Sequence, residues 1–254
     1  MHEELETQLR ILVSNDDGVF SPGIRALAQV ASEFGQVRVV APDVEQSAMS
    51  HAITIRRPLH YTQTTIDGLE AYRVDGTPAD CVALGAYNWE AVDLVLSGIN
   101  LGYNIGHNIW HSGTVAAAKQ AAFLRIPAIA FSAPGTGSEV DYEALKPFVK
   151  DVIERFLSVP DMLLLNANLP GEPKGVLWTR QSVRHYEGYV IQGEDPLGRT
   201  HYWFAEEPTE QVEEGTDRWA IEHDLVSLTP IRLDLTDERL LQRSKAANSS
   251  GVAG

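Results

Sequence analysis

The stretch Arg10–Phe20, Arg-Ile-Leu-Val-Ser-Asn-Asp-Asp-Gly-Val-Phe, decides the fold of this chain, because a short apolar run stops abruptly on polar residues. The run Ile11–Val13 is typical of a strand buried on both faces, and a proline and a glycine soon restart the chain as a helix. Asp16 and Asp17 are therefore expected at the carboxyl end of a strand, the edge of an open α/β sheet where ligands bind. Two adjacent carboxylates repel each other, so a cation between them, or free access of water, would stabilise the pair. Taken alone, Asn-Asp-Asp-Gly is more often a solvated turn.

Helix and strand patterns alternate through the next part of the chain. Helices are expected at Pro22–Phe34, from Pro78 with Thr77 as N-cap, at Val115–Leu124 and at Tyr142–Phe156. Buried strands are expected at Val37–Ala41, Asp93–Leu96, Ile129–Ser132 and Met162–Leu165. A polar loop, Asp43–His51, is expected to lead through Ala52–Ile55 into a hairpin that turns at Asp67-Gly68. This order predicts an α/β fold with a doubly wound, mostly parallel sheet, Rossmann-like and three-layered, over residues 1–170.

Beyond Pro170 the pattern changes, since strands follow one another without helices between them. They are expected at Val176–Thr179, Tyr186–Ile191, His201–Phe204 and Leu225–Thr229. Residues 171–254 are therefore predicted to form a β-rich C-terminal appendage packed on the core. The acidic stretch Glu206–Asp217 is typical of a solvated loop, Thr236–Lys245 of a short helix, and Ala246–Gly254 of a frayed tail.

Composition excludes several classes of function. The formal charge of −15, from 35 acidic and 20 basic residues, argues against a nucleic-acid polymer as partner, because phosphate backbones are bound by clustered Lys and Arg. The single cysteine, Cys81, allows no internal disulfide and no thiolate metal cluster. No apolar run is long enough to cross a membrane, and the first residues, Met1–Glu4, lack the order of a signal peptide. The sequence therefore predicts a cytoplasmic protein that does not bind a membrane.

Two further loops carry candidate site residues. Asn100 and Asn104 lie in a glycine-rich segment, Ser97–Gly106, whose glycines allow a close backbone approach to a ligand. The sequence Ser112-Gly113-Thr114 precedes a strongly helical stretch, where N–H groups, hydroxyls and the helix dipole suit a phosphate; an ordinary N-cap is the alternative. Because the glycine segment and the acid pair each follow a buried strand, these loops are expected to open on one sheet edge.

The chain resembles the SurE family of metal-dependent nucleotide phosphatases on five segments in the right order and spacing. They are Ile11–Gly18, Val40–Asp43 with Ser47, Val74–Cys81, Ser97–Asn100 and Ser112–Ala118; a later match is Ser227–Pro230 with Asp234. The resemblance implies a metal-dependent hydrolysis of nucleoside 5′- and 3′-monophosphates to nucleoside and phosphate, with short polyphosphate as a further substrate of some members. It also implies a homodimer or homotetramer in which C-terminal hairpin arms embrace the partner, and the aromatic region Tyr186–Phe204 is a candidate arm.

The resemblance also implies the ligand sets. The metal ligands fall on Asp16, Asp17, Ser47 and Asn100, and the phosphate contacts on Ser112, Gly113 and Thr114, with Asn104 and Ser47 close by. Carboxylate, hydroxyl and amide oxygens are hard donors that suit Mg²⁺ or Mn²⁺, with Ca²⁺ as an alternative and one ion per subunit expected; zinc would prefer His or Cys. The loops around Ser47 and His107 depart from the family pattern, so His107 and His111 are read either as acid catalysts or as pocket walls.

The mechanism expected from these residues is metal-assisted hydrolysis of a phosphate monoester by an in-line water. Asp16, Asn100 and Ser112 are expected to carry catalysis, with Asp16 orienting or deprotonating the water; direct attack by Asp16 is the alternative.

Two alternative functions belong to other classes of protein. A receiver-like Mg²⁺-binding signalling domain would need an acceptor Asp and a Lys at strand ends where this chain has Asn100 and Ser132. A non-catalytic nucleotide-binding protein on a dinucleotide-type fold is disfavoured, because no Gly-x-Gly-x-x-Gly follows the first strand.

Overall fold

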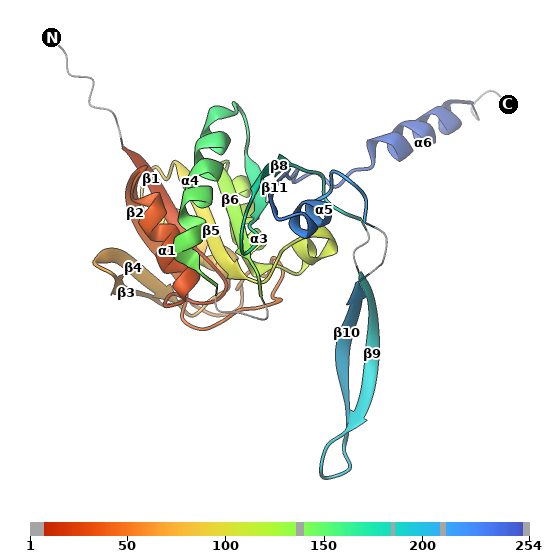
Figure 1. Cartoon of the computed structure of the whole chain (residues 1–254), viewed down its shortest axis with the longest axis horizontal. Coiled ribbons are helices and arrows are strands. Elements are labelled where there is room, and N and C mark those ends of the chain that lie inside the picture. Colours follow the sequence, from red (N-terminus) through yellow and green to blue (C-terminus); the bar gives the residue numbers. More distant parts are fainter. Residues whose placement is uncertain (1–7, 136–139, 184–185, 209–211, 251–254) are drawn as a thin grey trace.

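Nine strands form the central sheet of the computed structural model, which describes residues 8–135, 140–183, 186–208 and 212–250 (Figure 1). They are β1 (Leu9–Ser14), β2 (Gly35–Pro42), β3 (Tyr61–Ile66), β4 (Leu69–Val74), β5 (Leu94–Leu101), β6 (Ala128–Ala133), β7 (Leu164–Asn168), β8 (Gly175–Trp178) and β11 (Leu225–Pro230). Their spatial order is β3-β4-β2-β1-β5-β6-β7-β11-β8. The run from β4 to β7 is parallel throughout, while β3 and β11 pair antiparallel to β4 and β7. The predicted doubly wound, mostly parallel sheet is confirmed.

Strand β1 lies at the point where the strand order reverses. The chain leaves β1 towards β2 on one side, and β5 pairs with β1 on the other, with Ser14 opposite Ser97. In open α/β sheets this switch point creates a crevice at the carboxyl ends of the two strands. The acid pair after β1 and Asn100 near the end of β5 therefore share one edge of the sheet.

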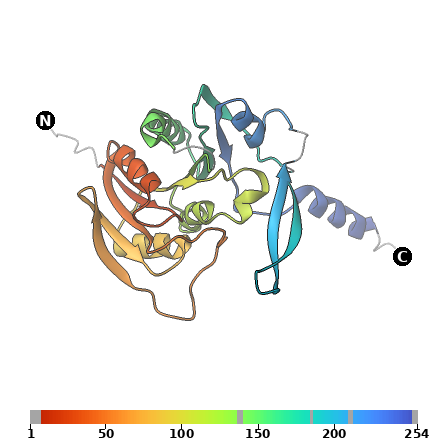
Figure 2. The ribbon, with the colours of Figure 1, turned by 60° about the horizontal axis from the view of Figure 1, so that its bottom comes forward.

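Helices cover both faces of the sheet, which gives three layers (Figures 1 and 2). One face packs against α1 (Pro22–Ala31) and α4 (Tyr142–Ser158), and the other against α2 (Pro78–Asn88) and α3 (Gly113–Phe123). Ile11 and Val13 point into the first core and Leu12 into the second, all fully buried, as expected of a strand covered on both sides. Helix α3 is buried along most of its length, because its small side chains let it lie close to both the sheet and α2. No helix in the described ranges is long and apolar enough to cross a membrane.

The start of α2 shows why this segment forms a helix. Thr77 accepts the N–H of Asp80, Asp80 accepts the N–H of Thr77, and Pro78 occupies the first helical position. This capping box satisfies two N–H groups that would otherwise lack partners. The Thr77 hydroxyl also donates to the carbonyl of Ala52, which ties the preceding loop to the helix.

Replacing Thr77 with Ala is expected to lower the free energy of unfolding by about 1 to 2 kcal/mol, because a buried cap and a loop contact are lost together. Urea titration followed by circular dichroism measures the change. The exposed variant Thr62→Ala on β3 should lie within about 0.5 kcal/mol of the unmodified protein, as surface positions usually do. An equal loss in both variants would contradict the capping role.

The glycine-rich segment differs from its prediction as a loop. Strand β5 runs on to Leu101 and so includes Ser97–Asn100, with a register shift against β6 between Ser97 and Asn100. Gly98 has a φ of +137°, and a Cβ there would lie 2.4 Å from the carbonyl oxygen of Phe131. A glycine is therefore required where the strand bulges, and its turn-like composition obscured the strand.

Smaller differences concern element boundaries. Helix α1 ends at Ala31 rather than Phe34, and Ala52–Ile55 belongs to no strand, although the hairpin at Asp67-Gly68 is confirmed. Strand β7 starts at Leu164 rather than Met162 and runs past the predicted end at Leu165 to include Asn166 and Asn168, both fully buried. Buried amides within a strand need partners, and they find them in the candidate site described below.

The C-terminal part divides between the sheet and a projecting hairpin. Strands β8 and β11, expected in the appendage, are part of the nine-stranded sheet, and α5 (Asp217–Glu222) lies in a region expected to lack helices. Strands β9 (Tyr186–Glu194) and β10 (Thr200–Pro208) form a separate two-stranded arm that extends away from the body (Figures 1 and 2). The division into units at residue 170 stays a prediction.

Two C-terminal expectations need correction. Asp217, assigned to a solvated loop, is fully buried at the start of α5, while residues 209–211 of that stretch lie outside the described residues. Helix α6 (Glu238–Ser250) includes the first part of the stretch expected to be a frayed tail; residues 251–254 are not described, nor are residues 1–7 at the amino terminus.

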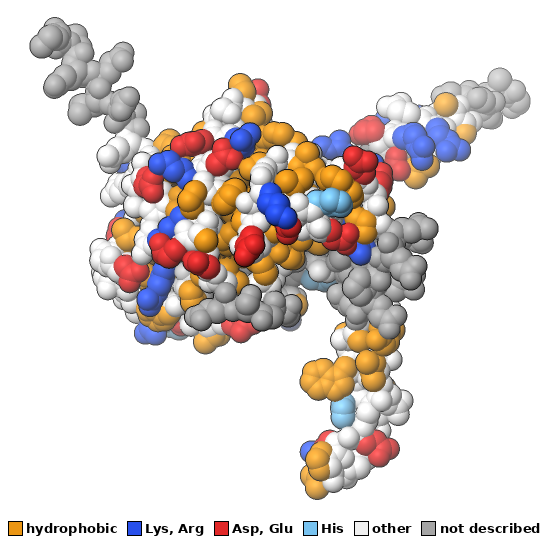
Figure 3. Space-filling view, in the orientation of Figure 1, with side chains coloured by type: hydrophobic (Ala, Val, Ile, Leu, Met, Phe, Trp, Pro, Cys, Tyr) orange, Lys and Arg blue, Asp and Glu red, His pale blue; other side chains and the backbone are white. Residues whose placement is uncertain are grey.

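The arm exposes large hydrophobic side chains, which Figure 3 shows gathered along it. Phe204 is 91% exposed and Trp203 66%, and Tyr202, Val190 and Ile191 are also exposed. A two-stranded hairpin is at best marginally stable alone in water, and exposed apolar patches mark interaction sites. The arm therefore has the properties of a contact surface.

Candidate active site at the carboxyl edge of the sheet

The turn after β1 is held rigidly by Asn15. Its amide nitrogen donates to the carbonyl of Gly18 at 3.0 Å and to the hydroxyl of Ser21 at 2.8 Å. Ser21 in turn caps α1 by accepting the N–H of Ile24. The turn that carries the two acids is thus tied to the start of the next helix.

Asp16 meets the start of α3. The hydroxyl of Thr114 donates to Asp16 Oδ1, and the main chain of Gly113 and Thr114 also favours the ionised carboxylate. The contact is tight, since a Cβ on Gly113 would lie 2.8 Å from both Cβ and Oδ2 of Asp16. The acid pair and the sequence Ser112-Gly113-Thr114, about a hundred residues apart in the chain, are therefore neighbours.

Asp17 lies beside the end of β5. The N–H of Leu101 donates to Asp17 Oδ2 at 3.3 Å, and Leu101 directly follows Asn100. The amide nitrogen of Asn100 donates to the carbonyl of Gly102 at 2.6 Å. With its nitrogen engaged, Asn100 would offer a cation its oxygen Oδ1.

The electrostatics of the acid pair favour a bound cation. Burial raises the pKa of Asp16, and burial together with the charge of Asp16 raises the pKa of Asp17 to about 6, with a smaller effect of Glu45. Desolvation is the main cause at both carboxylates, and Asp16 adds repulsion at Asp17; a divalent cation would offset both effects. Among the described residues, no group of three or more His, Cys, Asp or Glu side chains is arranged so that it could hold a metal ion. A metal here would depend on two carboxylates with amide, hydroxyl and water oxygens, a donor set that fits Mg²⁺ or Mn²⁺.

Ser47 lies on a loop that borders the acid pair. The N–H of Gln46 donates to the carbonyl of Asp16 at 2.7 Å, and the N–H of Ser50 to the carbonyl of His111 at 3.0 Å. The loop therefore bridges the two segments of the site. The hydroxyl of Ser47 is exposed and donates to Glu45 Oε1 at 2.6 Å. While it donates to Glu45 its oxygen lone pairs are still available to a metal, whereas donating to a phosphate would require the hydroxyl to turn away from Glu45.

Asn104 is held from several sides by buried amides and hydroxyls. Its N–H donates to Asn168 Oδ1 and its amide nitrogen to Ser132 Oγ, both at 2.8 Å, while its carbonyl accepts from Asn166 Nδ2 at 2.7 Å. The side-chain nitrogen expected to contact phosphate is thus engaged with Ser132. Asn104 anchors the segment between β5 and α3 to the ends of β6 and β7.

Ser112 is the N-cap of α3. Its hydroxyl accepts the N–H of Val115 at 3.0 Å, and Gly113 and Thr114 form the first turn of this 11-residue helix. The first N–H groups of such a helix, together with its dipole, form an anion site. Thr114 is fully buried and its hydroxyl contacts Asp16, so it is placed to orient the carboxylate.

Replacing Thr114 with Val is expected to lower kcat/KM by about 10- to 100-fold, the usual effect of losing a partner that orients a metal-binding carboxylate. Thr114→Ser keeps the hydroxyl and should retain most of the activity. Steady-state kinetics with a nucleoside monophosphate compare the two variants. Equal activity in both would remove the orienting role.

Two side chains that contact the segment between β5 and α3 were not predicted from the sequence. Asp217 Oδ2 accepts the N–H of Gly106 at 2.8 Å, and Gln181 Nε2 donates to the carbonyl of Gly106 at 2.7 Å. Because Asp217 lies in an acidic stretch, its composition did not distinguish it from exposed loop residues. The sequence Thr216-Asp217, directly before an apolar helical stretch, is the N-cap signal that could have revealed it.

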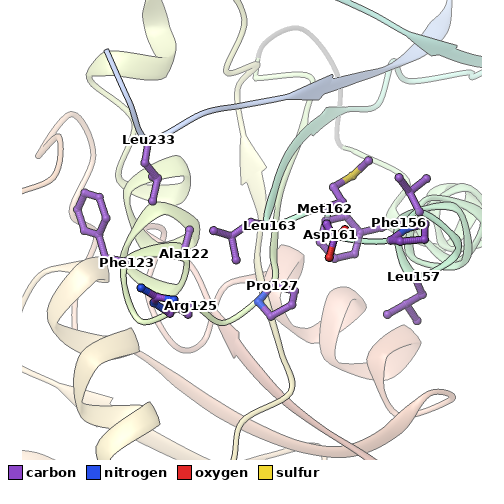
Figure 4. Close-up of a pocket in the computed structure, with 12 residues that line it drawn as sticks. Ala122, Phe123, Arg125, Pro127, Phe156, Leu157, Asp161, Met162, Leu163 and Leu233 are labelled. Atoms are coloured by element: carbon purple, nitrogen blue, oxygen red, sulfur yellow. The ribbon is translucent and has the colours of Figure 1, made fainter. Parts of the chain in front are cut away.

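A prominent groove elsewhere in the molecule is unrelated to these residues. Its volume is about 810 Å³, and it lies where β6 and β7 begin, at the opposite edge from the acid pair. Figure 4 shows Phe123 and Arg125 on one side of it and Phe156 and Leu157 on the other. The groove is mainly apolar and contains none of the candidate ligands, which lie at the carboxyl edge.

Known proteins resemble this chain over nearly its whole length. Residues 11–188 match the family model described as "Survival protein SurE". The protein named 5′-nucleotidase SurE 1 of Thermus thermophilus is 50% identical over 242 residues, covering 92% of this chain and 96% of the relative. The 5′-nucleotidase SurE of Deinococcus radiodurans is 44% identical over 241 residues, covering 91% and 90%. The crystal structure of the SurE protein of Aquifex aeolicus has a TM-score of 0.81 at 39% identity and covers 94% of this chain and 99% of the other.

Proposed function

The chain belongs to the SurE family, and we propose that it is a metal-dependent phosphatase that hydrolyses nucleoside 5′-monophosphates to nucleoside and phosphate. It is accordingly a phosphoric monoester hydrolase of the 5′-nucleotidase type. The observation that carries the proposal is the contact between Asp16 and Thr114, which sets a buried carboxylate against the start of a helix suited to phosphate.

Family membership implies a divalent metal cofactor. Asp16, Asp17, Ser47 and Asn100 would hold it, and we propose Mg²⁺ or Mn²⁺, with Ca²⁺ as an alternative and one ion per subunit. When bound, such an ion polarises phosphoryl oxygens and neutralises their charge. The adjacent carboxylates with raised pKa values support this assignment.

The residues of the site then have separate roles in the reaction. The N–H groups of Gly113 and Thr114, with Ser112 as their cap, hold the transferring phosphoryl group at the positive end of α3. Asp16, oriented by the Thr114 hydroxyl, positions a water for in-line attack on phosphorus and accepts its proton, while the bond from phosphorus to the nucleoside oxygen breaks and that oxygen takes up a proton from solvent. Asn100 fixes the end of β5 beside Asp17, so that the two acids and the helix start face one reacting group.

The proposal is tested by measuring phosphate release from a panel of nucleoside monophosphates with Mg²⁺, Mn²⁺, Ca²⁺ or chelator. We expect hydrolysis that depends on divalent metal, and a marked loss in Asn100→Ala. Binding of a nucleotide without turnover would favour a non-catalytic binding protein, and stable uptake of phosphate from acetyl phosphate would favour a receiver-like domain. Either result would overturn the proposal.

Finer features of the function are also proposals. Hydrolysis of 3′-monophosphates and of short polyphosphate is included in the panel. A homodimer or homotetramer built through the arm β9–β10 is supported by the exposed Trp203 and Phe204. Light scattering of the full chain and of a Trp203→Ser, Phe204→Ser variant tests it, since a monomer in both would exclude assembly through the arm. The expected cytoplasmic location, and the expected absence of nucleic-acid polymers and membranes as partners, stay predictions.

A further inference from the structure

The segment between β5 and α3 connects Asn100 to Ser112 and so joins the proposed metal and phosphate ends of the site. It contains the 3₁₀ helix η1 (Gly106–Trp110), which leads directly into the start of α3. Asn104 fixes the first part of the segment to β6 and β7, as described above. The position of its second part depends on what holds Gly106.

Both backbone polar groups of Gly106, its N–H and its carbonyl, are bound by side chains from the base of the arm. Its N–H, the first of η1, donates to Asp217 Oδ2 at 2.8 Å, and its carbonyl accepts from Gln181 Nε2 at 2.7 Å. Gly106 is buried and has a φ of +53°, a conformation that favours glycine. The two hydrogen bonds fix the backbone position of Gly106, six residues before Ser112, in the segment between β5 and α3.

The two side chains belong to the chain segments that enter and leave the arm. Arg180 donates its N–H to Gly215 at 3.0 Å and accepts that of Asp217 at 2.9 Å, which pairs the segments before β9 and after β10. Asp217 Oδ1 also accepts the N–H of Ser182 at 2.9 Å. The fully buried carboxylate of Asp217 therefore connects the segments before β9 and after β10 to the segment between β5 and α3.

We propose that Asp217, with Gln181, is a positioning residue for phosphate binding, acting through Gly106 and η1 on the start of α3. The inference rests on the proposed phosphatase function. The carboxylate is suited to this role because its two oxygens accept N–H groups from both sides, Gly106 on one and Ser182 and Arg218 on the other. An amide at this position can accept on only one side, and its NH₂ group would face an N–H on the other.

The experiment compares Asp217→Asn and Gln181→Met with the unmodified full-length protein. Binding of inorganic phosphate in the presence of Mn²⁺ is measured by calorimetry. Assays of phosphate release give KM, kcat and the Mn²⁺ concentration at which activity is half-maximal. We expect affinity for inorganic phosphate to fall about tenfold in Asp217→Asn and less in Gln181→Met. KM should rise in parallel, while the Mn²⁺ requirement should stay unchanged, because Asp16 and Asp17 are not in contact with Asp217. The effects of the two substitutions should be non-additive in the double variant, since both act on the backbone of Gly106.

The matched control is Thr179→Val, which removes a buried hydrogen bond of 2.7 Å to Thr229 in the same region but does not contact Gly106. Thermal unfolding shows how far each variant is destabilised. If Asp217→Asn leaves phosphate affinity within twofold, as Thr179→Val should, while the two variants lower the melting temperature alike, the contacts to Gly106 are only structural and the proposal is overturned. Should the unmodified protein bind phosphate without hydrolysing nucleotides, the proposed function fails, yet the phosphate titrations still decide the role of Asp217.

Discussion

Asp16→Asn is expected to lower kcat/KM for metal-dependent hydrolysis by about 10³-fold or more, because a metal acting on a phosphoryl group contributes several kcal/mol to catalysis. The substitution keeps the shape of the side chain and an oxygen for the Thr114 hydroxyl, but removes the negative charge that a cation requires. The protein should still fold, and in chelator it should unfold at an equal or higher temperature. The reason is that a buried carboxylate beside Asp17 costs free energy when no cation is present.

Steady-state kinetics with saturating Mn²⁺ and thermal unfolding with chelator measure both effects. Asp67→Asn is the matched control, because the same chemical change occurs in an exposed hairpin turn whose φ of +49° asparagine tolerates well. The control should leave activity unchanged. Retention of a tenth of the activity in Asp16→Asn would remove this residue from the metal set.

Gly113→Ala is expected to lower kcat/KM by about 10²-fold, the effect that a displacement of about 1 Å has on a catalytic group. The new Cβ would lie 2.8 Å from Cβ and Oδ2 of Asp16 and 3.1 Å from Cγ of Pro78. Neither neighbour is the end of a flexible side chain, since Asp16 is held by Thr114 and Pro78 starts α2. The start of α3 must therefore move away from the acid pair.

The control for this variant is Gly175→Ala on β8, where the nearest atom to a new Cβ is the side-chain end of Leu225 at 3.3 Å. Kinetics and thermal unfolding of both variants are compared. Normal activity in Gly113→Ala would mean that the contact between α3 and the acid turn does not matter for catalysis. Equal loss in Gly175→Ala would mean that the effect comes from reduced stability.

The sequence predicted the sheet well because buried parallel strands read as apolar runs. Ile11–Val13 and Ile129–Phe131 are covered by helices on both faces. Their side chains are therefore apolar throughout, a composition that indicates a buried strand. The prediction ended β5 too early, since Gly98 and Asn100 have the composition of a loop although they continue the strand. It also missed α5, because a buried Asp217 cannot be told from its exposed acidic neighbours by composition alone.

The site was accessible to sequence reasoning only where topology brings residues together. Asp16 follows β1 and Thr114 starts a helix of the same sheet edge, so their proximity follows from the rule for open α/β sheets. The orientation of Ser47 towards Glu45 depends on a loop whose path no periodicity specifies. The bond from Gly106 to Asp217 joins residues 111 positions apart through the base of the arm, and no local pattern encodes it.

The burial of α3 restricts how this enzyme can change over evolution or in the laboratory. Its alanines fill the space between sheet and α2, so a larger side chain at Ala117 or Ala118 would shift the end of the helix that contacts Asp16. New substrate preferences should therefore arise by substitutions and insertions in the loop Asp43–His51 outside Ser47, and at His107 and His111, while the helix stays invariant. A library restricted to those surface positions should yield altered selectivity with little loss of folding, and one directed at the helix should yield mainly inactive protein.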